Sequence, residues 1–155
     1  SLAYAMEDGL QEFYRVLAGR AQEEEARQLY LRLMGFEDAH KARLLAEYRK
    51  VHGPEARPEE KMAGLMEGGG RVADFLARID AHLNGKGDIL ELAMALETQA
   101  LDLYGRMAQK SAQPKVRAFF LRLADEEKTH LSYLADEMDT TLSQSPGILA
   151  GKQER

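Results

Sequence analysis

Apolar residues recur every three or four positions along four long stretches of the chain, which is the period of an amphipathic helix. The first two stretches cover about residues 2–21 and 24–51, and the last two cover about 88–110 and 114–140. No stretch alternates apolar and polar residues with the period of two that a half-buried strand requires. The pattern therefore predicts an all-α fold.

The lengths of the connections predict how these helices are arranged. Short turns near residues 21–24 and 110–113 make the helices within each pair antiparallel. About 36 residues separate the two pairs, and they contain a short amphipathic stretch at about 71–83. A connection of this length can cross a whole bundle. We therefore expect an antiparallel four-helix bundle over residues 1–140, with a long crossover that contains a short helix, followed by a flexible tail at 141–155.

Acidic residues and histidines interrupt the apolar stripes of all four helices, and they do so in register. The second half of the chain repeats the first at an offset of 90 residues, and the repeat keeps these polar residues. The matched pairs are Glu7 with Glu97, Tyr14 with Tyr104, Glu37 with Glu127 and His40 with His130. Each half thus carries one helix with a lone Glu and one helix with a Glu-x-x-His pair.

The residue types and their spacing are typical of a dinuclear metal site. Residues three apart project from one face of a helix, so the Glu and His of each pair can bind the same ion or neighbouring ions. Two such pairs and two lone Glu, all pointing into a helix bundle, form the ligand set of a carboxylate-bridged centre. The predicted metal ligands are Glu7, Glu37, His40, Glu97, Glu127 and His130.

The alternative interpretation is that these residues are ordinary surface glutamates and core histidines. An unpaired buried carboxylate costs several kcal/mol, and four that converge also repel one another. No Lys or Arg lies on the same stripes, whereas two divalent ions would balance four carboxylates. This charge balance favours the metal site. Tyr14 and Tyr104 lie two turns after the lone Glu of their helices, and we expect them to hydrogen-bond ligating carboxylates and orient them.

Composition limits the other classes of function. The chain has 155 residues, enough for one domain, and its net charge of −5 comes without a Lys/Arg block, so neither nucleic acid nor a membrane is an expected partner. The absence of cysteine excludes disulfides, a cysteine nucleophile and Cys-ligated electron-transfer centres from this chain. With no membrane-spanning run and no signal peptide, we expect a cytoplasmic location. The chain begins at Ser1 rather than Met, so we expect it to come from a longer or processed product.

Three motifs and one further Glu carry a resemblance to a known family. The sequence resembles the ferritin-like superfamily, and within it the rubrerythrin branch, at Glu7, at EDAH (37–40), at ALETQALDLY (95–104) and at EKTH (127–130). The resemblance implies a four-helix domain that holds two iron ions. It also implies reactions such as reduction of hydrogen peroxide, activation of dioxygen or oxidation of ferrous iron.

The chain departs from the rubrerythrin pattern at two points. Rubrerythrins carry an extra carboxylate near the main ligand of the third helix, whereas this chain has Ala100 one turn after Glu97. Rubrerythrins also usually carry a Cys-rich rubredoxin module, and this chain has no Cys. We therefore expect electrons to come from a separate donor protein.

The leading hypothesis is a di-iron carboxylate oxidoreductase of the peroxidase or ferroxidase type that reduces hydrogen peroxide or dioxygen. The alternative is an iron-sequestering or regulatory metal-binding module without turnover, and a third hypothesis is a metal-free structural domain. Manganese or zinc can take the place of iron, because carboxylate and imidazole suit all three. The sequence leaves the oligomeric state open and is compatible with a homodimer.

The repeat keeps each predicted ligand but changes some of the neighbours. Phe36 corresponds to Glu126, and Leu10 corresponds to Ala100. The two ions should therefore share ligand types and differ in their surroundings. Because Ala100 is smaller than Leu10, we expect the open position for peroxide or dioxygen on the Glu97 side.

Overall fold

The described part of the chain is helical, which confirms the all-α prediction. The computed structural model describes residues 1–58, 64–66, 69–79, 83 and 85–144. Its helices are α1 (Leu2–Arg20), α2 (Glu24–His52), α3 (Val72–Ile79), α4 (Lys86–Lys110) and α5 (Pro114–Gln144). Among these residues there is no β-strand, only an isolated antiparallel bridge between Leu65 and Arg71.

The ends of the helices follow local chemistry. α2 ends at His52, where Gly53 adopts a positive φ of 104° and Pro54 cannot continue the helix. α4 begins at Lys86 with Gly85 in the N-cap position. α5 begins at Pro114, whose fixed φ suits the first turn of a helix.

α5 continues beyond the boundary at residue 140 that the sequence suggests. Hydroxyl groups near its end donate hydrogen bonds to the carbonyl oxygens one turn earlier, from Thr140 to Asp136 at 2.9 Å and from Ser143 to Asp139 at 2.8 Å. These bonds satisfy the polar side chains within the helix, so the predicted tail is helical as far as Gln144. The remainder of that tail, 145–155, lies outside the described residues.

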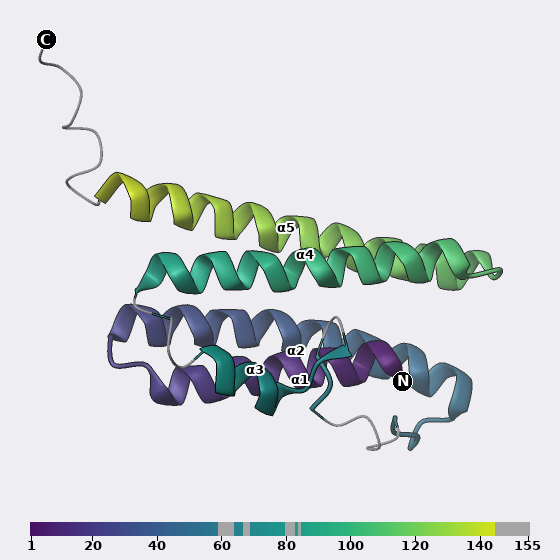
Figure 1. The fold of residues 1–155 in the computed structure, drawn as a ribbon. Coiled ribbons are helices and arrows are strands. Elements are labelled where there is room, and N and C mark those ends of the chain that lie inside the picture. The colour runs from purple at the N-terminus through teal and green to yellow at the C-terminus, as the bar shows by residue number, and fades with distance from the viewer. Residues whose placement is uncertain (59–63, 67–68, 80–82, 84, 145–155) are drawn as a thin grey trace, which may run out of the picture.

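The long helices pack as two pairs, α1 with α2 and α4 with α5 (Figure 1). α2 and α4 run in the same direction, and α1 and α5 run opposite to them (Figure 1). One cluster of buried apolar side chains draws on all four helices, and it includes Leu10, Leu33, Leu90 and Leu134. This cluster therefore joins the two helix pairs.

The described residues just before and within α3 pack against α1. α3 lies against α1 (Figure 1), and Met66, just before it, is fully buried in the core. At Gly9 of α1, a Cβ would overlap the carbonyl oxygen of Leu65, so this close approach requires glycine. The connection therefore covers α1. None of the helices in the described ranges is both long and apolar enough to cross a bilayer.

Candidate metal centre

All six predicted ligands point into the interior between the two helix pairs. Their side chains are about fully buried, except that of His130, which keeps 13% of its surface exposed. α1 contributes Glu7 and α4 contributes Glu97, while α2 contributes Glu37 with His40 and α5 contributes Glu127 with His130. Every long helix therefore supplies at least one polar side chain to a single buried cluster.

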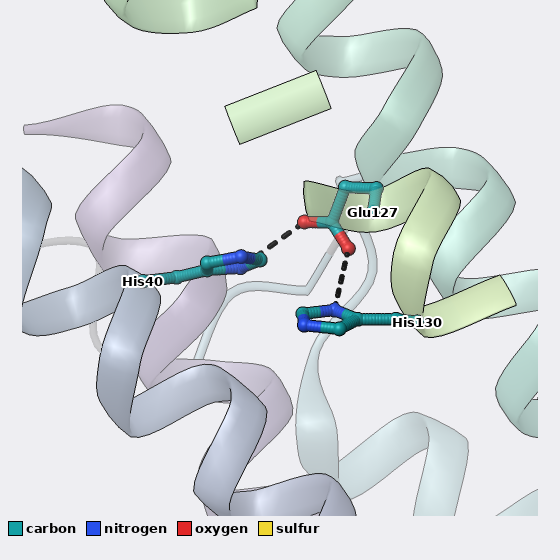
Figure 2. Close-up of side chains that lie close together, drawn as sticks. All are labelled: His40, Glu127 and His130. Carbon is teal, nitrogen blue, oxygen red and sulfur yellow. Dashed lines mark hydrogen bonds and ion pairs between the residues drawn. The ribbon is translucent and has the colours of Figure 1, made fainter. Parts of the chain in front are cut away.

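Glu127 connects the two Glu-x-x-His pairs. Its Oε1 lies 3.1 Å from Nδ1 of His40, on the other helix pair, and its Oε2 lies 3.2 Å from Nδ1 of His130 (Figure 2). A single carboxylate thus lies between two imidazoles that come from helices α2 and α5. The two histidine rings are 5.0 Å apart between centroids.

The remaining carboxylates surround the same two imidazoles. Nδ1 of His40 is 3.5 Å from Oε1 of Glu7, and Glu7, Glu37 and His40 each offer a ligand atom within 4.8 Å of the others. On the other side, Oε2 of Glu97 is 3.3 Å from Nδ1 of His130. His40 also belongs to a second group of the same size, with Glu127 and His130. The cluster therefore contains two overlapping groups of possible metal ligands, which share His40.

The carboxylates differ in how their ionisation is perturbed. Burial, followed by the charges of the other carboxylates, Glu7 first, raises the pKa of Glu37 well above its usual value. Burial also raises the pKa of Glu97 to about 7, against the opposing effect of His130. For Glu127 burial acts in the same sense, but the neighbouring imidazoles of His130 and His40 outweigh it and lower its pKa to about 2.

The pKa values of both histidines are raised, although their burial acts to lower them. Burial alone would lower the pKa of His40, but Glu127 and Glu7 outweigh it and raise this pKa to about 10. The pKa of His130 is also raised, because Glu127 and Glu97 outweigh its burial. Protons on the two imidazoles thus compensate part of the negative charge of the carboxylates. The cluster therefore attracts positive charge.

The donor atoms fit a pair of metal ions. Five oxygens of the four carboxylates are buried without a hydrogen-bond partner among the described residues: both of Glu7 and Oε1 of Glu37, Glu97 and Glu127. Buried acceptors are seldom left in this state unless a ligand satisfies them. Carboxylate oxygens with imidazole nitrogens suit iron, manganese or zinc, so the chemistry of the set agrees with its geometry.

The two predicted tyrosines are both buried in the core, and Tyr104 lies beside this cluster. The ring of Tyr104 meets the ring of His40 edge-on at 6.2 Å, and its buried hydroxyl has no hydrogen-bond partner among the described residues. Tyr14 is fully buried and packs near Tyr30, with 6.4 Å between ring centroids. A hydrogen bond from either phenol to a ligating carboxylate stays a prediction.

The predicted access route beside Ala100 also stays a prediction. Ala100 is buried in a cluster that includes Leu44, Tyr104 and Leu123. Its small volume is therefore enclosed by apolar side chains, and enlarging it would disturb the core as well as the centre.

Three residues near the centre were missed from the sequence. Oε2 of Glu126 lies 3.3 Å from Nε2 of His40, and Arg43 forms an ion pair with the same oxygen. The ring of Phe36 stacks on His130 with 4.0 Å between centroids and an interplanar angle of 4°. The only signal in the sequence was that positions 36 and 126 are equivalent in the repeat but carry different residues.

Comparison with known proteins bears on the second helix pair. No curated protein and no solved structure gives a significant match to the chain. Residues 88–145, which span most of α4 and all of α5, match the rubrerythrin family model. The matched segment contains Glu97, Glu127 and His130, together with the motifs that carry the resemblance in this half. This part of the chain is therefore rubrerythrin-like, as its motifs predict, and the match indicates a di-iron carboxylate protein.

Proposed function

We propose that this chain is a di-iron carboxylate oxidoreductase domain that reduces hydrogen peroxide or dioxygen with electrons from a separate donor protein. The observation that carries the proposal is the buried cluster in which Glu127 lies between His40 and His130. The reaction with peroxide consumes two electrons and two protons and yields two water molecules. The rubrerythrin match over residues 88–145 supports iron as the metal.

The two helix pairs divide the ligands between two metal positions. In this proposal Glu7, Glu37 and His40 serve the first position, while Glu97, Glu127 and His130 serve the second. Four carboxylates with neutral imidazoles balance the charge of two ferrous ions. When bound, a ferrous pair supplies two electrons to peroxide or dioxygen.

The surrounding side chains keep bulk water away from the ligands. Tyr104 packs against the edge of His40, and Phe36 covers one face of His130. A low-dielectric setting strengthens the attraction between the carboxylates and a bound cation. The small exposed fraction of His130 makes the second position the more accessible one to a small oxidant.

We also infer that the four long helices form a ferritin-like bundle in which the connection between α2 and α4 is the crossover. Support comes from the shared direction of α2 and α4 (Figure 1) and from the core that all four helices share. In such a bundle, inward-facing carboxylates and Glu-x-x-His pairs meet near its middle.

The chain contains no cysteine and so cannot hold a Cys-ligated redox centre of its own. We propose that another protein delivers the electrons, and that the reaction stops after one oxidation when this donor is missing. This dependence separates the enzyme from a module that only sequesters iron.

The test is consumption of hydrogen peroxide by protein loaded anaerobically with ferrous iron, with and without reduced rubredoxin as donor. Many turnovers per chain with the donor, and about one oxidation of the iron pair without it, are the expected results. A single oxidation followed by iron retention under both conditions would contradict the enzyme and support sequestration. A Glu37→Ala, Glu127→Ala double variant is the control for peroxide that decays without the centre.

A further inference from the structure

The side chains at two equivalent positions of the repeat make different kinds of contact with the two histidines. Position 36 on α2 contacts the histidine of α5, and position 126 on α5 contacts the histidine of α2. The contacts are therefore related by the same offset of 90 residues as the ligands. One contact is an aromatic ring, Phe36, and the other is a carboxylate, Glu126.

The two ring nitrogens of His40 face different groups. Nδ1 faces Glu7 and Glu127 at 3.5 and 3.1 Å, whereas Nε2 lies 3.3 Å from Oε2 of Glu126. A nitrogen that binds a metal ion must offer its lone pair, so the proton of a neutral ring stays on the other nitrogen. That tautomer places the proton on Nε2, within donor–acceptor distance of Oε2 of Glu126, although the two atoms form no aligned hydrogen bond in this structure. A carboxylate that accepts this proton once the ring binds a metal would fix both the tautomer and the orientation of the ring.

Arg43 holds Glu126 in this position from the surface. It lies one turn after His40 on α2 and pairs with the same oxygen of Glu126 that faces the imidazole. The side chains of Arg43 and Glu126 keep 50% and 32% of their surface exposed. The chain Arg43, Glu126, His40 therefore runs from the surface to the buried centre.

His130 is held by a different kind of contact. Its hydrogen-bond contacts to Glu97 and Glu127 are both at Nδ1, and one face of its ring stacks on Phe36. Stacking limits the tilt of the ring but supplies no acceptor for Nε2–H. Stacking also does not raise the basicity of the ring nitrogen that would bind the metal.

We propose that Glu126 is a positioning residue for His40, and that the metal position of Glu7, Glu37 and His40 consequently binds its ion more tightly and fills first. The proposal rests on the pair of metal positions in the proposed function. Hydrogen-bonded partners of ligating histidines orient the ring and raise its basicity, and their loss typically weakens metal binding about 10–100-fold.

The chain offers matched variants for the test. Glu126→Leu removes the acceptor, whereas Glu126→Gln keeps an oxygen that can accept from Nε2–H. Asp125→Asn is the control, because Asp125 is 72% exposed and pairs with Lys128 at 2.8 Å. Phe36→Leu removes the ring that stacks on His130. Arg43→Met acts on Glu126 from an exposed position, so it tests the same contact if Glu126→Leu does not fold.

The experiment is anaerobic titration of each apoprotein with Co²⁺, followed by calorimetry and by visible absorption. Wild type should bind two ions per chain in two steps. Glu126→Leu should weaken the tighter step about 10–100-fold, and Glu126→Gln should weaken it less. Arg43→Met should act in the same direction by about tenfold or less. Phe36→Leu should weaken only the second step, and Asp125→Asn should leave both steps unchanged.

A second readout reports on the histidine itself, with Phe36→Leu as the control for a general loss of stability. In the Zn²⁺-loaded protein, nitrogen-15 NMR should detect a slowly exchanging proton on Nε2 of His40. The signal should be lost in Glu126→Leu and kept in Phe36→Leu. Retention of the signal in folded Glu126→Leu would overturn the positioning role.

The titration separates failure of this inference from failure of the proposed function. If wild type binds no pair of ions, the dinuclear centre itself is wrong. If wild type binds two ions but Glu126→Leu leaves both affinities unchanged, only the role of Glu126 is wrong. Two equal steps in wild type, or equal weakening in Asp125→Asn, would also overturn the inference.

Discussion

The two halves of the chain present the same predicted ligands in different surroundings. In the first half, Leu65 covers Gly9 of α1, and His40 is only 1% exposed. In the second half, the residue equivalent to Gly9 is Gln99, which is exposed, and His130 is 13% exposed. The repeat thus keeps the chemistry of the ligands, while residues outside the repeat decide how deeply each half is buried.

The difference also extends to the charges next to the centre. The first-half histidine has a carboxylate on its outer nitrogen, and the second-half histidine has an aromatic ring against its face. Two positions with the same ligands can therefore differ in affinity and in access. Changes made in both halves test the chemistry that the halves share. Changes made in one half test the difference in their surroundings.

The largest effect is expected from removing one shared carboxylate from each half. Glu37→Ala combined with Glu127→Ala should abolish binding of the metal pair and leave the helical content unchanged, because the helices are held by the apolar core. Metal analysis and far-ultraviolet circular dichroism measure the two outcomes. The matched control is Glu12→Ala with Asp102→Ala, another repeat pair, whose carboxylates are exposed and pair with Arg15 and Arg106. Two metals bound to the first variant would contradict the ligand assignment.

Removing the metals should lower the melting temperature at pH 7. An ion present at a thousand times its dissociation constant stabilises the folded state by about 4 kcal/mol. For a chain of this size that corresponds to a shift on the order of 10 °C. Thermal unfolding with and without a chelator measures the shift. Equal melting temperatures would show that the carboxylates do not need a cation.

The stability of the metal-free protein should fall as the pH rises from 5 to 8. The pKa of Glu37 is raised well above its usual value, and that of Glu97 is raised to about 7. A raised pKa means that the folded state binds the proton more tightly than the unfolded state does. The resulting stabilisation of the folded state is complete at a pH below the unfolded-state pKa. It is lost as the pH rises through the folded-state pKa. Melting of apoprotein at several pH values measures this loss. Glu37→Gln should flatten the profile, and an equal slope in that variant would contradict the assignment.

Two helix glycines should respond oppositely to the same substitution, which tests the cover over the first half. Gly9→Ala should destabilise by about 1–3 kcal/mol, because the new methyl group overlaps the backbone of Leu65. Gly105→Ala meets nothing within 4 Å and should stabilise α4 by about 0.5–1 kcal/mol. Denaturant unfolding of both variants measures the difference. Stabilisation by Gly9→Ala would show that the connection does not rest on α1.

The six side chains that the structure brings together could be singled out from the sequence because they violate the helical pattern twice in the same way. Glu7 and Glu97 each interrupt an apolar stripe, and two Glu-x-x-His pairs do the same at equivalent positions. Burial of charge is costly, so a repeated violation points to a shared function. The all-α class follows from the same periodicity.

The surroundings of the ligands could not be predicted, since they depend on how distant segments meet. Glu126 lies about 100° around its helix from Glu127, so the sequence pattern places it on a face exposed to solvent. Its contact with His40 exists only because the fold brings this part of α5 close to α2. Gly9 likewise carries no signal until Leu65 is placed against it. The extra turn of α5 carries side-chain hydrogen bonds from Thr140 and Ser143, which the pattern of apolar residues does not predict.

The central claim is that the six residues hold two metal ions per chain, and metal content tests it most directly. The protein should be expressed with iron, purified without oxygen and analysed for metal and protein in the same sample. Two ions per chain are predicted for wild type and for the Glu12→Ala, Asp102→Ala control. A folded wild-type protein that binds fewer than one ion per chain after reloading with ferrous iron would contradict the claim.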